Sequence, residues 1–214
     1  MSLQNQTLFA REDIKEVDGL NFVGLKAPAR TGIVAGTKVE TEKGWIAVEM
    51  ILSGMKVQTY AGLRRVAKVE RFFIEPANQA HFPAGLLLVP GGALNNCSAF
   101  YILPEQHVLL ETIYAEEIFG DAATLIPGAA LEGFRGIAAV RPRGLLEVII
   151  LRFDEEDVVY GNTGVLFHSP SVGAANGCGM RSDFYLTLTK GQAVALLDLL
   201  EAGILTTQEI RRSV

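Results

Sequence analysis

The chain has few of the residues that mark disulfide-rich or zinc-binding proteins. It contains two cysteines, Cys97 and Cys178, in 214 residues. Two cysteines cannot build a disulfide framework, and their wide separation does not match the C-x-x-C spacing of a zinc pair. We therefore expect both to be free thiols of a protein in a reducing compartment.

Long apolar runs and an excess of basic charge are also missing. The longest apolar run, 145–151, is interrupted by Glu147, and its length suits a buried strand rather than a bilayer span of about 20 residues. The 19 basic and 24 acidic residues give a formal net charge of -5, which offers no basic surface for a phosphate backbone. We expect no membrane span and no nucleic-acid partner.

We expect no secretory signal in the first 30 residues. Such a signal needs an unbroken apolar stretch, whereas charged residues crowd the segment 11–18. We therefore expect the protein to be cytoplasmic, unless another signal directs its export.

The composition and the order of apolar runs predict a folded, mainly all-β protein. Hydrophobic residues make up 49% of the chain and charged residues 20%, which is typical of globular domains. Between 36 and 163, short β-rich runs alternate with Gly, Pro and Asn, and only 115–119 suggests a helical turn. Strands are expected at 37–41, 45–48, 57–60, 63–74, 86–89, 100–103, 108–111, 123–126, 145–153 and 158–160.

The domain organisation follows from a change of composition after Ser169. The segment 172–180 is rich in glycine and small residues, which is typical of a flexible connection rather than of a phosphate-binding loop, because no Lys-Ser/Thr follows it. We expect three parts: an N-terminal segment 1–30, a β domain 31–170, and a glycine-rich connection with C-terminal helices at 171–214.

Two capping boxes predict two helices at the C-terminus. Thr189 and Gln192 open the first helix, which Gly203 is expected to end. A second box at 206–209 opens a shorter helix that runs to Arg212. Two interpretations stay open: the helices pack on their own domain, or they mediate self-association into a homo-oligomer.

Six short motifs follow one another between Thr31 and Ser169. The first is Thr31–Val39, of sequence TGIVAGTKV, which leads through Gly44 to Val48–Ile51. The later motifs are Gly92–Leu94, Pro104–His107, Glu116–Gly120, Leu125–Pro127 and Phe153–Asn162. Each is weak alone, but six in this order rarely arise by chance. Together they resemble the bacterial branch of the Hint (Hedgehog/intein-like) domain family.

The resemblance implies a compact Hint-like β fold and a particular chemistry. In that family a Cys or Ser at the first position attacks the carbonyl that precedes it and forms a thioester or ester. A Thr or Ser and a His of a second block polarise and protonate the scissile amide, and a later His or Asp assists proton transfer. The family therefore cleaves its own chain where these groups are present.

Three of these four groups are missing at the matching positions of this chain. The family opening Cys-Phe-x-x-Gly-Thr places the nucleophile at Gly32, and the block Thr/Ser-x-x-His places the hydroxyl at Pro104 and the imidazole at His107. The family stretch Phe-Asp-x-His-Glu-Val-Val places the later His at Glu156. Only His107 is kept, so these positions form a vestigial site in which His107 should face Gly32 across a shallow cleft.

A shift of the register by one residue gives an alternative in which Thr31 is the nucleophile. Thr31, His107 and Glu156 would then cleave the chain and release the preceding segment. A threonine at the start of a strand is more often structural. Likewise, a lone His107 beside apolar neighbours is more often a half-buried, hydrogen-bonded side chain than a catalyst.

The other chemistry-bearing residues favour structural interpretations. His81 and His168 are isolated, and no metal-ligand spacing connects them, so we expect no metal and no cofactor. The acidic run 154–157 is expected to be a solvated hairpin end, and Cys97 to be exposed in a turn. The chain is thus predicted to be a non-enzymatic binding or presentation module with an unknown protein partner.

Overall fold

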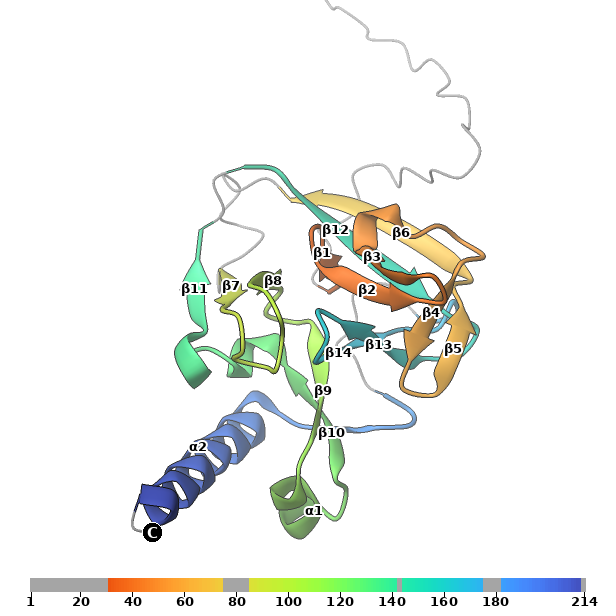
Figure 1. The fold of residues 1–214 in the computed structure, drawn as a ribbon. Coiled ribbons are helices and arrows are strands. Elements are labelled where there is room, and N and C mark those ends of the chain that lie inside the picture. The colour runs from red at the N-terminus through yellow and green to blue at the C-terminus, as the bar shows by residue number, and fades with distance from the viewer. Residues whose placement is uncertain (1–30, 75–84, 142–143, 175–181, 213–214) are drawn as a thin grey trace, which may run out of the picture.

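Most of the described chain is β-structure arranged in two sheets (Figure 1). The computed structural model describes residues 31–74, 85–141, 144–174 and 182–212. The predictions for the segment 1–30, for His81, for Cys178 and for most of the glycine-rich connection lie outside these residues. The expected mainly all-β fold is confirmed.

The first sheet places the start of the domain at its centre. Within the described residues, its strands in order across the sheet are β11 (Ala138–Val140), β7 (Leu86–Val89), β8 (Phe100–Ile102), β1 (Ile33–Val34), β12 (Leu146–Arg152) and β6 (Lys68–Ile74). All these pairs are antiparallel. Because β1 lies between β8 and β12, the chain enters the fold in the middle of a hydrogen-bonded sheet.

The second sheet carries the rest of the candidate site. Its described strands, in order, are β15 (Leu186–Thr187), β10 (Ala123–Pro127), β9 (His107–Glu111), β14 (Val165–Ser169), β13 (Asp157–Gly161), β2 (Lys38–Thr41), β4 (Lys56–Thr59) and β5 (Gly62–Arg65), with β3 (Gly44–Ala47) paired to β2. Only the pair β10–β15 is parallel among the described strands. Within the described residues, three 3-10 turns join strands: η1 (Val48–Met50), η2 (Gly128–Ala130) and η3 (Phe134–Gly136).

The predicted single strand 63–74 is instead two strands in different sheets. β5 pairs with β4 in the second sheet, and β6 pairs with β12 in the first. The change occurs at the fully buried Val66, whose N–H donates to the Met55 carbonyl. The N–H of Ala67 then donates to the Arg152 carbonyl. The chain crosses between sheets here, which an unbroken β-rich pattern does not reveal.

The main core lies between the two sheets. It brings Ile149 and Leu151 of β12 into one cluster with Val108 of β9 and Phe167 of β14. Phe167 also meets Phe100 edge-on, with ring centroids 5.6 Å apart. Burying each such side chain stabilises the fold by about 1.5–3 kcal/mol, so this cluster fixes the mutual position of β9, β12 and β14.

The second sheet also buries part of its opposite face. Leu109 and Leu166 belong to a separate apolar cluster, although they directly adjoin Val108 and Phe167 of the main core. Successive side chains of a strand point to opposite faces, so one residue of offset decides on which side of this sheet a group lies. Tyr185 packs against the second cluster from outside the sheet.

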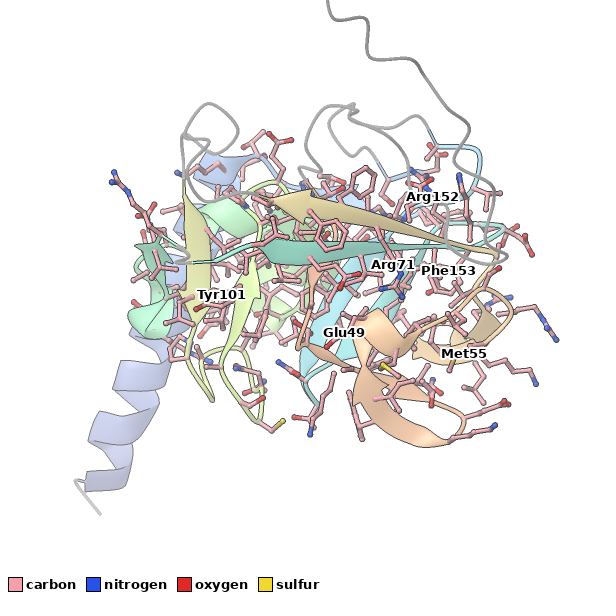
Figure 2. The ribbon with its side chains drawn as sticks, turned by 90° about the horizontal axis from the view of Figure 1, so that it is seen from above. Glu49, Met55, Arg71, Tyr101, Arg152 and Phe153 are labelled. Atoms are coloured by element: carbon pink, nitrogen blue, oxygen red, sulfur yellow. The ribbon has the colours of Figure 1, made fainter. Side chains whose placement is uncertain are left out.

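Two arginines form ion pairs that join β6 and β12 in the first sheet (Figure 2). Arg71 of β6 contacts the Glu147 carboxylate at 2.6 Å and donates to the Glu49 carbonyl at 2.6 Å. The buried Arg152 of β12 pairs with Glu70 at 3.2 Å. Burial alone would raise the pKa of Glu70, but Lys68 and Arg152 outweigh it and lower that pKa. Removing one partner of such a buried pair costs about 3–5 kcal/mol, so these contacts fix the position of β12.

The helical predictions are confirmed in part. The helix α1 (Ile113–Phe119) occupies the expected helical turn, and its N-cap Thr112 accepts a hydrogen bond from the Tyr114 N–H. The first C-terminal capping box is also present, because the Thr189 N–H donates to Gln192 Oε1 at 2.9 Å. No described helix combines the length and hydropathy that crossing a membrane requires.

The predicted break at Gly203 is wrong, and with it the second capping box at 206–209. One helix, α2 (Lys190–Arg212), runs through both (Figure 1). A Cβ atom at Gly203 would collide with the Tyr114 hydroxyl of α1. The glycine therefore permits a close approach between two helices instead of ending one. Ala193, Leu196 and Leu197 of α2 join the main core.

Candidate functional site

Gly32 lies immediately before β1 in a conformation and a space that admit only glycine. Its φ is +129°, which side chains of L-residues rarely adopt. A Cβ built there would lie 2.6 Å from Val148 Cγ1, 3.0 Å from Ile150 Cγ1 and 3.1 Å from the Ile149 carbonyl oxygen. The wall of β12 therefore excludes a side chain from the position that matches the nucleophile of the family.

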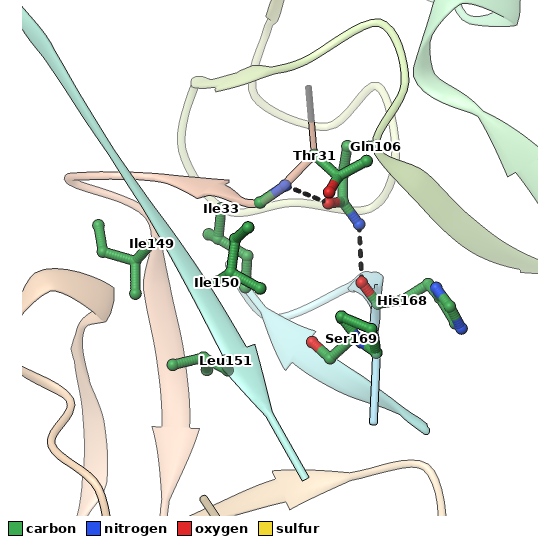
Figure 3. A pocket seen from close by; sticks show the side chains of 10 residues that line it. Thr31, Ile33, Gln106, Ile149, Ile150, Leu151, His168 and Ser169 are labelled. Carbon is green, nitrogen blue, oxygen red and sulfur yellow. Dashed lines mark hydrogen bonds between the residues drawn. The ribbon is translucent and has the colours of Figure 1, made fainter. Parts of the chain in front are cut away.

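The side chain of Gln106 holds the Gly32 amide (Figure 3). The Gly32 N–H donates to Gln106 Oε1 at 2.7 Å. Gln106 Nε2 donates to the His168 carbonyl at 2.9 Å and to the His107 carbonyl at 2.7 Å. Because Gln106 is fully buried, losing this acceptor would leave the Gly32 N–H without water as a substitute. The uncharged side chain of Gln106 thus holds the amide that precedes β1 by a hydrogen bond, and we call this contact the clamp.

A small pocket surrounds this amide (Figure 3). Its polar lining includes the Thr31 and Ser169 residues, and its apolar wall comes from β12. The lining residues are Thr31, Gly32, Ile33, Gln106, Ile149, Ile150, Leu151, His168, Ser169 and Pro170. Of the residues singled out in the sequence, the pocket therefore brings together Thr31, Gly32 and His168, whose backbone carbonyl accepts from Gln106.

His107 points to the other face of the second sheet, so the expected facing of His107 and Gly32 is not observed. Gln106 and His107 are consecutive, and only Gln106 reaches Gly32. The ring Nδ1 of His107 lies 3.1 Å from the Glu105 carbonyl. Burial and the neighbouring His168 lower the pKa of His107 to about 4. At neutral pH the ring is uncharged and is not the imidazolium acid that would protonate a leaving amine, and it lies on the wrong face to reach Gly32.

Glu156 binds a segment that follows it by about 26 residues in the chain. Its Oε2 lies 3.4 Å from His168 Nε2, while its Oε1 accepts from the Ser182 hydroxyl and from the Phe184 N–H at 3.1 Å. Burial would raise the pKa of Glu156, but hydrogen bonds from His168, Ser182 and Phe184 outweigh it and lower the pKa to about 2. At neutral pH, Glu156 is therefore ionised, and it holds Ser182 and Phe184 by hydrogen bonds.

The expectations for the acidic run 154–157 and for His168 are wrong in part. The acidic run is solvated only at Asp154 and Glu155, because Asp157 is buried and accepts a hydrogen bond from Thr59 Oγ1 at 2.8 Å. His168 is buried beside Glu156 and is not isolated. Alternation along β13 and β14 produces these contacts, which spacing in the sequence does not show.

Pro104 supports the turn before β9 and contributes no polar side chain. It is buried, and its carbonyl accepts from the Ala129 N–H at 2.8 Å. Cys97 is an exposed free thiol, as expected. Within the described ranges, no three His, Cys, Asp or Glu side chains are grouped to hold a metal ion.

No motif or spacing in the sequence singles out Gln106, Ser169 or Ser182. Gln106 stands in the same Pro-Glu-Gln-His block as the conspicuous histidine, and strand alternation is the signal that could have separated the two. The site is thus split between the two faces of one sheet. Thr31, Gly32 and Gln106 lie on one side, and the side chains of His107, His168 and Glu156 lie on the other.

Two solved structures are similar to this chain. Among solved structures, the chain is similar to a bacterial intein-like domain from Clostridium thermocellum, with 16% identity, a TM-score of 0.47, and coverage of 65% of this chain and 99% of that one. It is also similar to a splice-inactive variant of the AceL NrdHF class 3 split intein, with 12% identity, a TM-score of 0.34, and coverage of 65% and 97%. No curated protein matches the chain.

A family model described as the Hint domain matches residues 31–169. This range coincides with the motifs from Thr31 to Ser169 and confirms the resemblance drawn from them. The match covers well over half of the chain, which therefore belongs to the Hint domain family.

Proposed function

We propose that this chain is a catalytically degenerate Hint domain that keeps its N-terminal junction intact and serves as a non-enzymatic binding or presentation module. The observation that carries the proposal is the lack of room at Gly32. A nucleophilic side chain would lie 2.6 Å from Val148 Cγ1 at its very first atom. The packing of β1 against β12 therefore leaves no space for a nucleophilic side chain. The nucleophile is missing because of this packing as well as because of the residue type at Gly32.

The hydrogen bond to Gln106 supports the same proposal. Cleavage before Gly32 requires its nitrogen to gain a proton as it leaves. Gln106 instead accepts the proton that this nitrogen already carries. The clamp stabilises the intact amide, so the residues before β1 stay attached to a rigid sheet that can present them to a partner protein.

Intact-mass spectrometry tests this proposal on the full chain. The purified protein is incubated for a prolonged period with and without dithiothreitol, which would resolve a thioester. We expect one species of 23.1 kDa under both conditions. Release of a fragment that ends at Thr31 or just before it would overturn the proposal.

Self-cleavage through Thr31 is the alternative within the same family. Its support is that Thr31 lines the pocket beside Ser169. Against it, His107 is directed away from the pocket, and the amide nearest to Gln106 follows Thr31 and does not precede it. The variant Thr31→Ala separates the two functions, because cleavage in the parent that is absent in this variant would establish the alternative.

Self-association through α2 is a second proposal for the C-terminal part. The helix leaves Val194 and Leu199 exposed, at 36% and 43%, one on each flank of its buried face. Multi-angle light scattering of the parent and of a Leu199→Lys variant tests it. A dimer mass that returns to the monomer mass in the variant would support association, whereas a monomeric parent would contradict it.

A further inference from the structure

The second sheet ends in a short edge strand. Among the described strands, β5 pairs only with β4, and it lies at the outer end of the sheet (Figure 1). Its residues Leu63, Arg64 and Arg65 are exposed, Leu63 at 50%. An edge strand offers backbone N–H and C=O groups to which another extended chain can add a strand. β5 therefore has the groups that strand addition requires.

The hydrogen bonds at the end of β5 show which of its backbone groups face outward. The Val66 N–H donates to the Met55 carbonyl at 2.8 Å, on the side of β4. Alternate residues of an antiparallel strand direct both backbone groups to the same neighbour, so Arg64 also faces β4. Leu63 and Arg65 therefore direct their N–H and C=O groups to the open edge.

The two strands at this end of the sheet are basic. They hold Lys56, Arg64 and Arg65, and neither β4 nor β5 contains Asp or Glu. Lys56 pairs with Glu42 at 3.6 Å. The surrounding segment 38–71 contains seven Lys and Arg against four Asp and Glu, whereas the whole chain has a net charge of -5. The edge is thus a basic surface on an acidic protein.

Both arginines of β5 keep donors for a further acceptor. Arg64 Nε lies 3.6 Å from Asp157 Oδ2, and Arg65 Nη1 donates to the Gly54 carbonyl at 3.2 Å. A guanidinium carries five N–H donors, and each of these contacts uses one nitrogen. The arginines can therefore also bind carboxylates of an added strand, in charge-assisted hydrogen bonds that are stronger than neutral ones.

We propose that β5 docks an extended acidic segment of a partner protein, which adds a strand to the second sheet and places carboxylates beside Arg64 and Arg65. The outward backbone groups of Leu63 and Arg65 supply affinity, and the two arginines select acidic side chains. The same charges disfavour a second copy of β5, because pairing two copies brings four arginines together.

The docking edge rests on the proposed role of the chain as a binding module and deepens it by giving the chemistry of the partner. It lies in a different part of the fold from the junction at Gly32. Intact mass therefore decides whether the junction is cleaved, and peptide binding decides separately whether β5 accepts a strand.

An NMR titration of the isotope-labelled full chain with a blocked peptide tests the docking edge. The probe is the acetylated and amidated hexapeptide Thr-Glu-Glu-Val-Thr-Val, whose Thr and Val residues favour strands. The amide shifts of Leu63 and Arg65 give the Kd. At a probe concentration of about ten times the Kd, we expect the exchange protection of these two amides to rise about 10-fold, while that of Ile149 in β12 stays constant.

Matched probes and variants separate strand addition from simple attraction of charge. A probe with lysine in place of both glutamates should not bind. A probe whose four central amides are N-methylated should bind at least about 10-fold more weakly, because it cannot donate to the edge. Arg65→Glu should weaken binding of the parent probe by at least about 10-fold. Arg141→Glu, the same change at an exposed residue directly after β11, should leave the Kd within about 2-fold.

Several results would overturn the proposal. They are unchanged Leu63 and Arg65 amides in the presence of the acidic probe, equal binding of the lysine or the N-methylated probe, and an unchanged Kd in Arg65→Glu. Equal binding of an oligothymidylate of the same charge would show that the edge recognises charge alone. Leu63 shifts that depend on protein concentration without a probe would identify a second copy as the occupant. The probe comparisons use the unaltered protein, so they decide the question even if Arg65→Glu does not fold.

Discussion

Replacing Gly32 with alanine tests the packing that excludes a nucleophile. Placing a Cβ at a φ of +129° costs about 1–2 kcal/mol in backbone strain. The contact with Val148 Cγ1 at 2.6 Å adds about 1–3 kcal/mol, because β12 must shift within a packed core. We therefore expect Gly32→Ala to lower the free energy of unfolding by about 3 kcal/mol.

Gly36→Ala is the matched control for this measurement. Gly36 also has a positive φ, +88°, but a Cβ there would meet nothing within 4 Å. Gly36→Ala should therefore lower the free energy of unfolding by the backbone strain alone, about 1 kcal/mol. Urea unfolding gives both values, and a difference of about 2 kcal/mol corresponds to a midpoint shift of about 1 M. Equal losses in the two variants would refute the claim that β12 excludes a side chain at Gly32.

Three further predictions follow from the contacts described above. Gln106→Leu leaves buried backbone groups unpaired and should lower the free energy of unfolding by about 3 kcal/mol in urea, and a loss below about 1 kcal/mol would mean that water replaces the clamp. Gly203→Ala should destabilise the chain by about 1–2 kcal/mol, and Tyr114→Phe, which removes the colliding hydroxyl, should recover part of it. Glu156→Gln should be less stable than the parent at neutral pH. Because the folded pKa of Glu156 is below 4.5, the difference in stability between parent and variant should shrink as the pH falls from 4.5 towards 2. An acid titration followed by circular dichroism measures this difference, and a constant difference would contradict the prediction.

The sequence predicts local features of this fold well, because they depend on neighbours in the chain. The alternation of β-rich runs with turn residues indicates the strands, and the pairing of Thr189 with Gln192 indicates the start of α2. The helix break at Gly203 could not be judged in the same way. A glycine that ends a helix and a glycine that admits Tyr114 have the same sequence signature, and only the position of α1 separates them.

The candidate site depends on contacts between distant residues, and the sequence indicates them less well. The motifs identify Gly32 and the block that holds His107, but one residue of strand alternation decides that Gln106 reaches Gly32. The role of Glu156 depends on Ser182 and Phe184, which no local pattern connects with it. Motif position therefore identified the family, whereas the opposite faces of the second sheet determine what each side chain can do.

The central claim is that this Hint domain cannot cleave its junction, because its geometry and not merely its missing groups prevents cleavage. The most direct test is the intact mass of a Gly32→Cys, Pro104→Thr double variant, which restores two family groups, incubated with dithiothreitol while circular dichroism monitors the folded fraction. We predict that the folded variant keeps its full length. Release of the first 31 residues from folded protein would show that β12 yields to a nucleophile, and would contradict the account.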